Sequence, residues 1–492
     1  MSARKLIPGI TAALALALAG CGGSKPGTSE SSGASLVRAD ALVFVAADSD
    51  LGSSQWKKVD ALAKKFPGRD KAIAQIERSL QKKGVDFERD VKPALGPEFD
   101  FAVVPGATLE DVAIAGLTKP DDPAKFKALL EKANSDPDSG KAAYRALDGG
   151  WYAISDTRAH IDQVLKGEGK PLSDESAYKD ALGKLPSDAL ATAYVNGAQL
   201  GKLIQRIVEA RGNPLAGAVP GLSKLDYITA SLSAEEAGLR LHGAAEGSGS
   251  KDLTGGAYSS KLISGVPADA LAFLTFRAGK GIDQLKTQLE TNPTFSQAIP
   301  QLEQALGVRV ADILTLLRGE TALYVRPGGA IPEFSLVLSP SDQNTALATL
   351  DRIARRLAVF TGARVTQGHE AGHSVKTVDF KQFAVRYTGL GDRVLITSGL
   401  NGVGAYTGHG PKLSNAAHFK EAKSTAGMPT SNTGFDYFDL QSSVALIQSL
   451  AGLSGESLPR EVTENLKPLR SFLAWGGHSG NAATFDAFLE IK

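Results

Sequence analysis

Residues 369–373 read H-E-A-G-H, and this spacing of histidine, glutamate and histidine could bind and use zinc. In zinc peptidases with an H-E-x-x-H sequence, the two histidines bind the metal and the glutamate is the general base. That chemistry requires a helix, because a helix brings His369 and His373, four residues apart, onto one face. The elements around the motif therefore decide whether it can act as a zinc site.

The neighbouring residues favour a loop. Gly368 and Gly372 bracket the motif, and glycine weakens a helix. An alternating run that is typical of a strand follows at 374–379. The next histidines, His409 and His418, are distant in the sequence, so no third ligand is evident. We expect HEAGH in a helix-to-strand loop, where adventitious metal binding by exposed histidines is favoured over a zinc peptidase site.

Two further segments, Ser54–Lys57 and Ser176–Lys179, fit the S-x-x-K pattern of penicillin-recognising enzymes. The S-D-N and K-T-G sequences that accompany this pattern are missing, and the chain has no G-x-S-x-G, P-loop or G-x-G-x-x-G sequence. Both segments fit better the surface of a helix whose aromatic residue packs into the core. The sequence therefore predicts a protein that is not an enzyme, without catalytic residues, cofactor-binding residues or metal ligands.

The single cysteine of the 492 residues, Cys21, follows an export signal. Arg4 and Lys5 provide a positive start, and residues 6–19 form a mainly apolar run. This is the layout of a secretory signal, and the run is shorter than the roughly 20 apolar residues that cross a bilayer. The small residues Ala19 and Gly20 then lead to Cys21.

The sequence Leu18-Ala19-Gly20-Cys21 resembles a bacterial lipobox. The resemblance implies transfer of a diacylglyceryl group to the Cys21 thiol, cleavage before Cys21 and acyl chains such as palmitate on the mature protein. An ordinary signal peptide with a chance cysteine is the alternative. We expect a signal peptide at 1–20, lipidation at Cys21 and a Gly/Ser-rich flexible tether at 21–38. The expected location is the extracytoplasmic face of the cell membrane, with membrane lipid as a partner through Cys21.

The charge balance argues against a nucleic-acid partner. The chain has 54 Lys+Arg and 53 Asp+Glu, and removal of the signal would leave 52 basic residues and a net charge of −1. A nucleic-acid-binding protein would favour a basic field. The hydrophobic content of 42% is ordinary for a globular chain.

The chain contains a long internal duplication. The segment ADALVFVAADSD at 39–50 returns as ADALAFLTFRAG at 268–279, and further similar segments follow in the same order. We therefore expect one repeat unit at 39–248 and a second at 267–492. A Gly/Ser-rich linker is expected between them at 249–266.

Within each unit, strands and hairpins alternate with helices. In the first unit, hairpins are expected at 142–155, around Asp148–Gly150, and at 227–244. The counterpart of the first hairpin is expected at 374–387. This pattern predicts an α+β fold, in which each unit is a largely antiparallel sheet with helices packed on one face.

The lipobox, the ADALVFVAADSD segment and the recurring L-S…Y/F-K…L/M-P segments resemble a bacterial lipoprotein family of unknown function from high-GC Gram-positive lineages. The resemblance implies a duplicated extracytoplasmic body and supplies no catalytic residues.

Three functions remain open from the sequence. The first is a non-catalytic, membrane-anchored binding protein for a small molecule, a lipid or another envelope component. The second is an envelope scaffold or protein-interaction module. The third and least favoured is a zinc peptidase that uses residues 369–373. The sequence leaves the oligomeric state undetermined.

Overall fold

The structure is a computed structural model, which describes the chain from residue 32 to residue 492. The segments not described within that range are 107–110, 137–139, 212–220, 254, 279–281, 284–285, 288, 290–292, 329–330 and 454–457. Cys21, the expected signal peptide at 1–20 and the first part of the expected tether lie outside the described residues. Within the described ranges, no helix is both long enough and apolar enough to cross a membrane.

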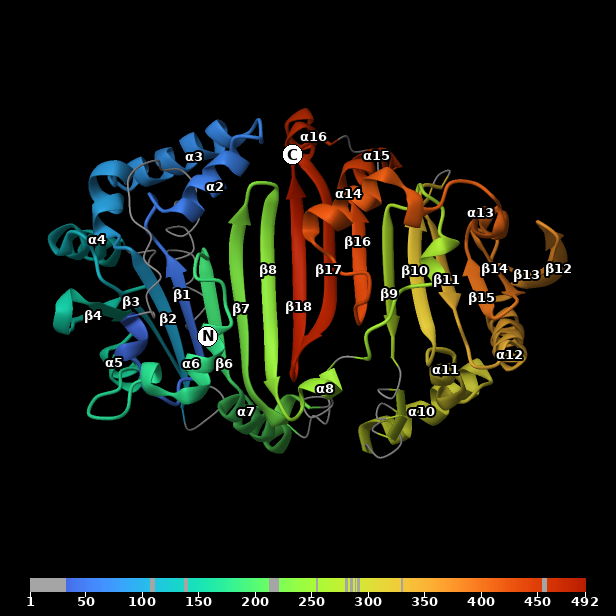
Figure 1. The fold of residues 1–492 in the computed structure, drawn as a ribbon, viewed down its shortest axis with the longest axis horizontal. Helices are drawn as coiled ribbons and strands as arrows, with labels where there is room; N and C mark the ends of the chain where they lie inside the picture. Colours follow the sequence, from blue (N-terminus) through green and yellow to red (C-terminus); the bar gives the residue numbers. More distant parts are fainter. Residues whose placement is uncertain are drawn as a thin grey trace. The chain divides into compact units, whose positions relative to one another are not determined.

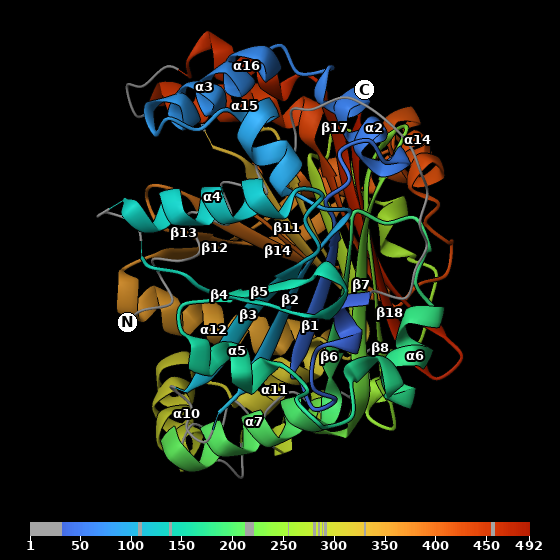
Figure 2. The ribbon, with the colours of Figure 1, turned by 90° about the vertical axis from the view of Figure 1, so that its left-hand side faces the viewer.

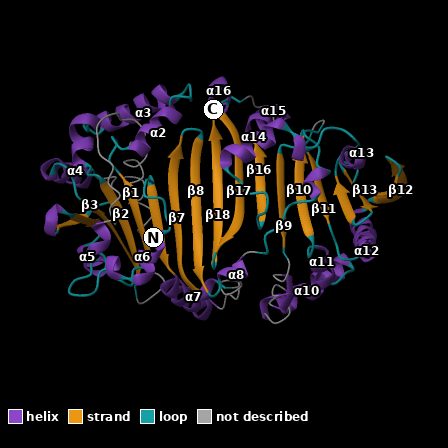
Figure 3. Ribbon diagram, viewed as in Figure 1, coloured by secondary structure: helices purple, strands orange, loops and turns teal. Residues whose placement is uncertain are grey.

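The chain divides into two compact units. Unit 1 comprises the described residues up to Ser250 together with Ile491 and Lys492, and unit 2 runs from Lys251 to Glu490. Every strand pair within the described part of either unit is antiparallel. Helices accompany each sheet (Figures 1 and 3), so the predicted α+β class is confirmed.

The sheet of unit 1 has the strand order β4-β5-β3-β2-β1-β6-β7-β8. Its strands are β1 (Val43–Asp48), β2 (Glu98–Pro105), β3 (Val112–Thr118), β4 (Ala143–Ala146), β5 (Tyr152–Ser155), β6 (Ala191–Asn196), β7 (Leu225–Glu235) and β8 (Gly238–Gly247). Both hairpins expected from the sequence are present, as β4–β5 and β7–β8. Gly149 and Gly150 have φ of 70° and 84°, which the turn between β4 and β5 requires.

The helices of unit 1 begin where local capping chemistry directs. They are α2 (Ser54–Ala63), α3 (Arg69–Lys82), α4 (Pro123–Ser135), α5 (Arg158–Val164), α6 (Ser176–Gly183) and α7 (Gly197–Arg211), with short turns η2 (Ser32–Ser35), η3 (Phe87–Val91), η4 (Lys92–Ala94), η5 (Asp148–Gly150), η6 (Leu172–Asp174) and η8 (Leu222–Lys224). Ser53 Oγ accepts the Trp56 amide at 3.2 Å, and Asp122 Oδ1 accepts the Ala124 amide at 2.9 Å. Side-chain oxygens at these positions satisfy backbone donors that a helix start leaves free.

The main core of unit 1 lies on one face of its sheet, called here the covered face. Phe44, Tyr194 and Tyr227 point to this face from the strands, and Tyr178 of α6 packs edge-on against Phe44 at a ring distance of 5.9 Å. The turns η2 and η6 and helix α5 complete the cover. On the opposite face, α4 packs over the edge formed by β5, β3 and the start of β2. Figure 2 shows α4 and α6 on opposite sides of the strands of unit 1.

Unit 2 has the strand order β12-β13-β14-β15-β11-β10-β9-β16-β17. Its strands are β9 (Ala272–Arg277), β10 (Glu320–Arg326), β11 (Glu333–Leu338), β12 (Arg364–Glu370), β13 (His373–Asp379), β14 (Ala384–Leu390), β15 (Arg393–Thr397), β16 (Gly434–Asp439), β17 (Leu469–Ser479) and β18 (Ala482–Ile491). Its helices and turns are α8 (Ser250–Leu253), η9 (Leu262–Ser264), α10 (Pro293–Leu306), α11 (Val310–Leu316), α12 (Gln343–Thr361), α13 (Gly402–Thr407), η10 (Leu413–Asn415), α14 (Ala417–Ala426), α15 (Leu440–Leu453) and α16 (Arg460–Leu466).

The two units share a strand order, and unit 2 carries one extra hairpin. Strands β14-β15-β11-β10-β9-β16-β17 repeat the order β4-β5-β3-β2-β1-β6-β7 of unit 1. Hairpin β12–β13 lies outside this shared set, beyond β14. The expected counterpart at 374–387 was therefore wrong by one strand, because β14 and β15 are the true counterparts of β4 and β5. Successive short strands have similar sequences, and only their pairing distinguishes them.

Residues 32–38 differ from the expected tether at 21–38, because they are part of unit 1. Ala34 and Val37 are fully buried in its core. The amide of Arg38 donates to Val164 O at 3.1 Å, and the amide of Lys166 donates to Leu36 O at 2.9 Å. The segment has apolar residues from Ala34 on, and their burial outweighs the Gly/Ser-rich composition that precedes them.

The expected linker at 249–266 also differs, because its second half belongs to unit 2. Tyr258, Leu262 and Val266 are buried. Glu320, at the start of β10, holds this segment to the sheet. Its carboxylate accepts the Ser260 hydroxyl at 2.5 Å, the Lys261 amide at 3.0 Å and the Leu262 amide at 3.2 Å. This buried carboxylate thus fixes the entry of the chain into unit 2.

We expect Glu320→Ala to lower the free energy of unfolding of unit 2 by about 3 kcal/mol, because three donors would lose a buried acceptor. Urea denaturation followed by circular dichroism measures this change. Glu168→Ala removes a carboxylate from an exposed loop and is expected to change stability by less than about 0.5 kcal/mol. Equal stability of the two variants would contradict this role of Glu320.

Candidate functional site

The HEAGH segment forms the turn of a β-hairpin, not a helix. His369 and Glu370 end β12, Ala371 and Gly372 make the turn, and His373 begins β13. Ala371 and Gly372 have φ of 49° and 80°, the left-handed values of a two-residue hairpin turn. The prediction that this segment is not helical is confirmed, and its placement in a helix-to-strand loop was wrong.

The hairpin register separates the two histidines. His369 lies opposite Ser374, and Glu370 lies opposite His373. Residues directly opposite each other share a face of the sheet, and neighbours along a strand alternate between faces. His369 and His373 therefore point to opposite faces and cannot bind one metal ion together. The described residues contain no group of three or more His, Cys, Asp or Glu side chains that could hold a metal.

Glu370 has a structural partner. Its Oε1 atom accepts the amides of Val403 at 2.9 Å and Gly404 at 3.0 Å, in the first turn of α13. No side chain of α13 itself caps this turn. The carboxylate thus supplies the N-terminal cap and faces the positive end of the helix dipole.

The S-x-x-K segments are positioned on helix surfaces, as their sequences suggested. Ser54 donates to Asp188 Oδ1 at 2.8 Å, and Trp56 Nε1 donates to Asp48 O at 2.8 Å. In the second segment, Tyr178 is buried in the core and Lys179 is exposed. In the described part of the chain, no hydrogen bond joins the serine of either segment, Ser54 or Ser176, to the lysine three residues after it.

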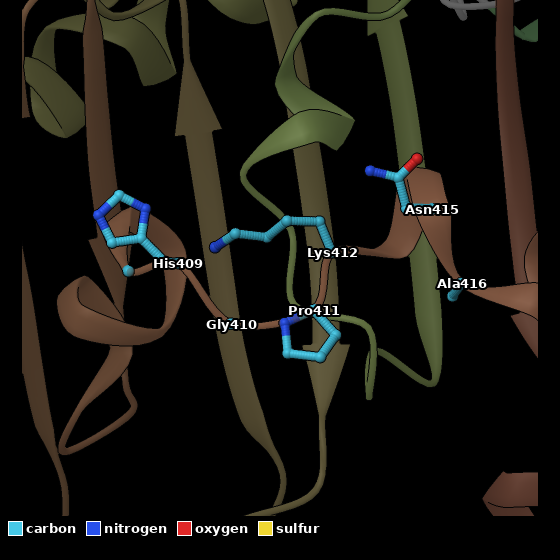
Figure 4. Close-up of a pocket in the computed structure, with 7 residues that line it drawn as sticks. His409, Gly410, Pro411, Lys412, Asn415 and Ala416 are labelled. Carbon is cyan, nitrogen blue, oxygen red and sulfur yellow. The ribbon is translucent and has the colours of Figure 1, made fainter.

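A surface hollow of about 470 Å³ lies between α13 and α14 and is lined by residues 408–412, 415 and 416. Figure 4 shows His409 and Asn415 on either side of Lys412. The Lys412 amine donates to Gly265 O at 3.2 Å, Ala405 O at 2.9 Å and Tyr406 O at 2.8 Å. Burial lowers the pKa of Lys412, and Arg326 lowers it further. Because three carbonyls use all three donors of this amine, Lys412 has no free hydrogen-bond donor to offer a ligand in the hollow.

The second face of the unit 1 sheet is apolar across six strands. The register aligns three rows of side chains on this face, from β3 through β2, β1, β6 and β7 to β8. The first row is Ile114, Val103, Val43, Val195, Ile228 and Ala245. The second is Gly116, Phe101, Val45, Ala193, Ala230 and Gly243. The third is Thr118, Phe99, Ala47, Ala191, Leu232 and Leu241. We call these rows the open face of unit 1.

No side chain in these rows is charged, and three of the residues are exposed, whereas Ala47, Gly116, Thr118 and Ala245 are buried. Ile114 is 41% exposed, Leu232 is 37% exposed and Leu241 is 40% exposed. On the covered face of β7, by contrast, Thr229 is 1% exposed and Ser231 is 3% exposed. An antiparallel sheet with one solvated face normally points its polar residues to the solvent. Strand β7 does the reverse, so the side chains that it leaves accessible on the open face are apolar.

Unit 2 has an equivalent face with one carboxylate. Its rows include Phe334 on β11, Leu323 on β10 and Phe438 on β16, which are 52%, 39% and 41% exposed. Asp436 lies on this face opposite Leu274, and burial raises its pKa. Helix α12 covers the part of the face nearest β14 and β15. Helix α4 likewise covers Phe99 at one end of the open face of unit 1. The open face of unit 1 differs in that its three rows contain no charged side chain.

Sequence reasoning did not identify the open face. The alternation of Ile228, Ala230 and Leu232 with polar residues is visible in the sequence and predicted the strand. It does not show which face the helices leave uncovered, because that depends on how the chain returns over the sheet.

We expect the purified chain to retain no stoichiometric zinc, because the two histidines point to opposite faces of a hairpin. Elemental analysis of the folded protein measures the metal content, and His373→Ala is the matched variant. Stoichiometric zinc that disappears in His373→Ala would contradict the hairpin geometry.

We expect Glu370→Ala to lower stability by about 1–2 kcal/mol through loss of the α13 cap, and Glu370→Gln to lower it less because one acceptor oxygen remains. Thermal unfolding measures both. The exposed neighbour Gln367→Ala serves as the control and should leave stability within about 0.5 kcal/mol. A structural cap predicts this order of stabilities, whereas a catalytic base would leave stability unchanged in both Glu370 variants.

Comparisons with known proteins place the chain in a family. Crystal forms III and I of TP0453, a Treponema lipoprotein, show a distant structural similarity at 15% identity and TM-scores of 0.25 and 0.24, over 47% of this chain and 80% and 78% of that chain. Folds at this level of similarity need not share a function. No protein with a curated description was found to match. Residues 132–490 match the family described as a protein of unknown function, DUF3352, and since the match spans more than half of the 492 residues, the chain belongs to this family.

Proposed function

We propose that this protein is a non-catalytic lipoprotein, anchored at the extracytoplasmic face of the cell membrane, that binds lipid acyl chains on the open face of unit 1. The observation that carries the proposal is the reversed alternation of β7, which points Leu232 outward, opposite the exposed Leu241 of β8, and buries Thr229 and Ser231. A ligand that covers the open face would remove its apolar surface from water.

The chemistry of the open face favours acyl chains over polar ligands. Its three rows present aliphatic and aromatic side chains, and Thr118 is the one polar residue among them. Helix α4 packs against Phe99 at one end of the third row. Along the first row, at a spacing of about 4.8 Å between strands, six strands span about 24 Å, which suits an extended acyl chain lying across the sheet. No charged group on the face would have to lose its hydration when such a chain binds.

The expected lipid anchor would keep this face near its ligand. The described body begins at Ser32, eleven residues after Cys21. At no more than about 3.5 Å per residue, this segment spans at most about 40 Å. A diacylglyceryl group on Cys21 would thus hold unit 1 within that distance of the membrane surface. The lipobox supports the anchor, and the open face supports the ligand class.

The test replaces two leucines that lie opposite each other on the open face. Leu232→Asp combined with Leu241→Asp introduces charges that an acyl chain would have to desolvate, so binding should weaken at least about tenfold. Titration with a fluorescent long-chain fatty acid measures binding to the full chain. Native mass spectrometry of protein extracted from its membrane identifies any lipid bound with it.

The matched control is Leu400→Asp, which changes a leucine that is 80% exposed and lies outside the strands. It should bind the fatty acid like the unaltered protein. Equal binding by the double variant and the control, or an extracted protein that carries no acyl lipid, would refute the proposal. Crosslinking that finds a protein on the open face instead would favour the envelope scaffold.

A further inference from the structure

The outer strand of the extra hairpin in unit 2, β12, has an unpaired edge. Its seven residues pair with β13 without a register shift, and within the described part of unit 2 its other edge has no partner strand. Residues 364–369 are all exposed. Figure 1 shows β12 as the outermost strand of unit 2. The hairpin adds to the strand order shared by both units.

Natural edge strands usually carry features that prevent pairing, and in β12 the charged residues Arg364 and Glu370 stand only at the two ends of the strand. Proline, lysine, a bulge or a very short strand are the common devices. The segment 365–369 reads V-T-Q-G-H and contains no charge or proline. The edge strand of unit 1, β4, is only four residues long and includes the charged Arg145. The edge strand β12 of unit 2 is therefore less protected against pairing with a further strand than the edge strand β4 of unit 1.

The turn geometry determines which backbone groups of β12 are free. Glu370 and His373 flank a two-residue turn and exchange both backbone hydrogen bonds, as the closing pair of such a hairpin does. The bonding direction alternates along a strand, so Val365, Gln367 and His369 direct their N–H and C=O groups away from β13. These three residues offer six backbone groups to a further strand.

We propose that β12 pairs with β12 of a second copy of this chain, antiparallel and centred on Gln367. In this register Gln367 faces Gln367 of the second copy, and the outward-directed Val365 faces His369 of the second copy. All six free backbone groups of each strand then find partners. This proposal concerns unit 2 and does not depend on the lipid ligand of unit 1.

The charges of β12 complement one another in that register. Arg364 lies opposite Glu370 of the second copy, so each end of the paired strands joins opposite charges. Oε1 of Glu370 holds α13, so the contact with Arg364 would use Oε2. A parallel arrangement would place like charges opposite each other, which is destabilising. The pattern of β12 thus favours an antiparallel second copy over an unrelated peptide.

Site-directed crosslinking of the full chain tests the pairing. With Cys21→Ser, Gln367→Cys provides the only thiol in the protein, and the two thiols of a pair would start from Cα atoms about 5.5 Å apart. A short bismaleimide should then give a covalent dimer. Lys420→Cys, on the exposed surface of α14, is the control. Its yield of covalent dimer should be at least about tenfold lower than that of Gln367→Cys.

A second substitution distinguishes edge pairing from random collision. His369→Pro removes an outward N–H that β13 does not use, so the hairpin persists while one outer bond is lost. In the Gln367→Cys background it should lower the dimer yield about tenfold, with unchanged circular dichroism. Arg364→Glu should lower the yield most at low salt. Dimer yields that match the control, or that His369→Pro leaves unchanged in a folded protein, would overturn the proposal.

Discussion

Each unit of this protein is built on a sheet with two apolar faces, although the helices of the unit cover only one of them in full. In unit 1 the covered face encloses Phe44, Tyr194 and Tyr227, and this burial stabilises the sheet. The opposite face keeps Ile114, Leu232 and Leu241 accessible. A stable core on one side therefore supports an apolar surface on the other, and the surface is rigid because the strands beneath it are packed.

The duplication provides an internal comparison of the two units. Strand order is shared, so differences between the units indicate where each has specialised. Unit 1 has the uncharged face, whereas the corresponding face of unit 2 includes Asp436. Unit 2 has the extra hairpin with the exposed strand β12. The two proposals, lipid on unit 1 and self-pairing at unit 2, thus rest on separate features and can fail independently.

Much of the secondary structure could be predicted, because its signals are local. The helix caps at Ser53 and Asp122 and the turn glycines at 149–150 act over only a few residues, and the hairpin expected around Asp148–Gly150 is present. The boundaries of the tether and the linker were harder to predict, because they depend on which residues are buried in the folded protein. Residues 32–38 and 258–266 are rich in small residues and looked like connecting chain, but a few apolar side chains in each pack into a core.

The sequence by itself determined the α+β class, the duplicated pattern and the exclusion of a helical zinc motif, since periodicity and glycine content act locally. Only the tertiary structure decided that HEAGH closes an additional hairpin, that His369 and His373 point apart and that Glu370 caps a helix 33 residues away. Only the tertiary structure also decided which sheet face stays open. The physical reason is that strand pairing and helix cover join residues distant in sequence, and alternating strands look alike until their partners are known.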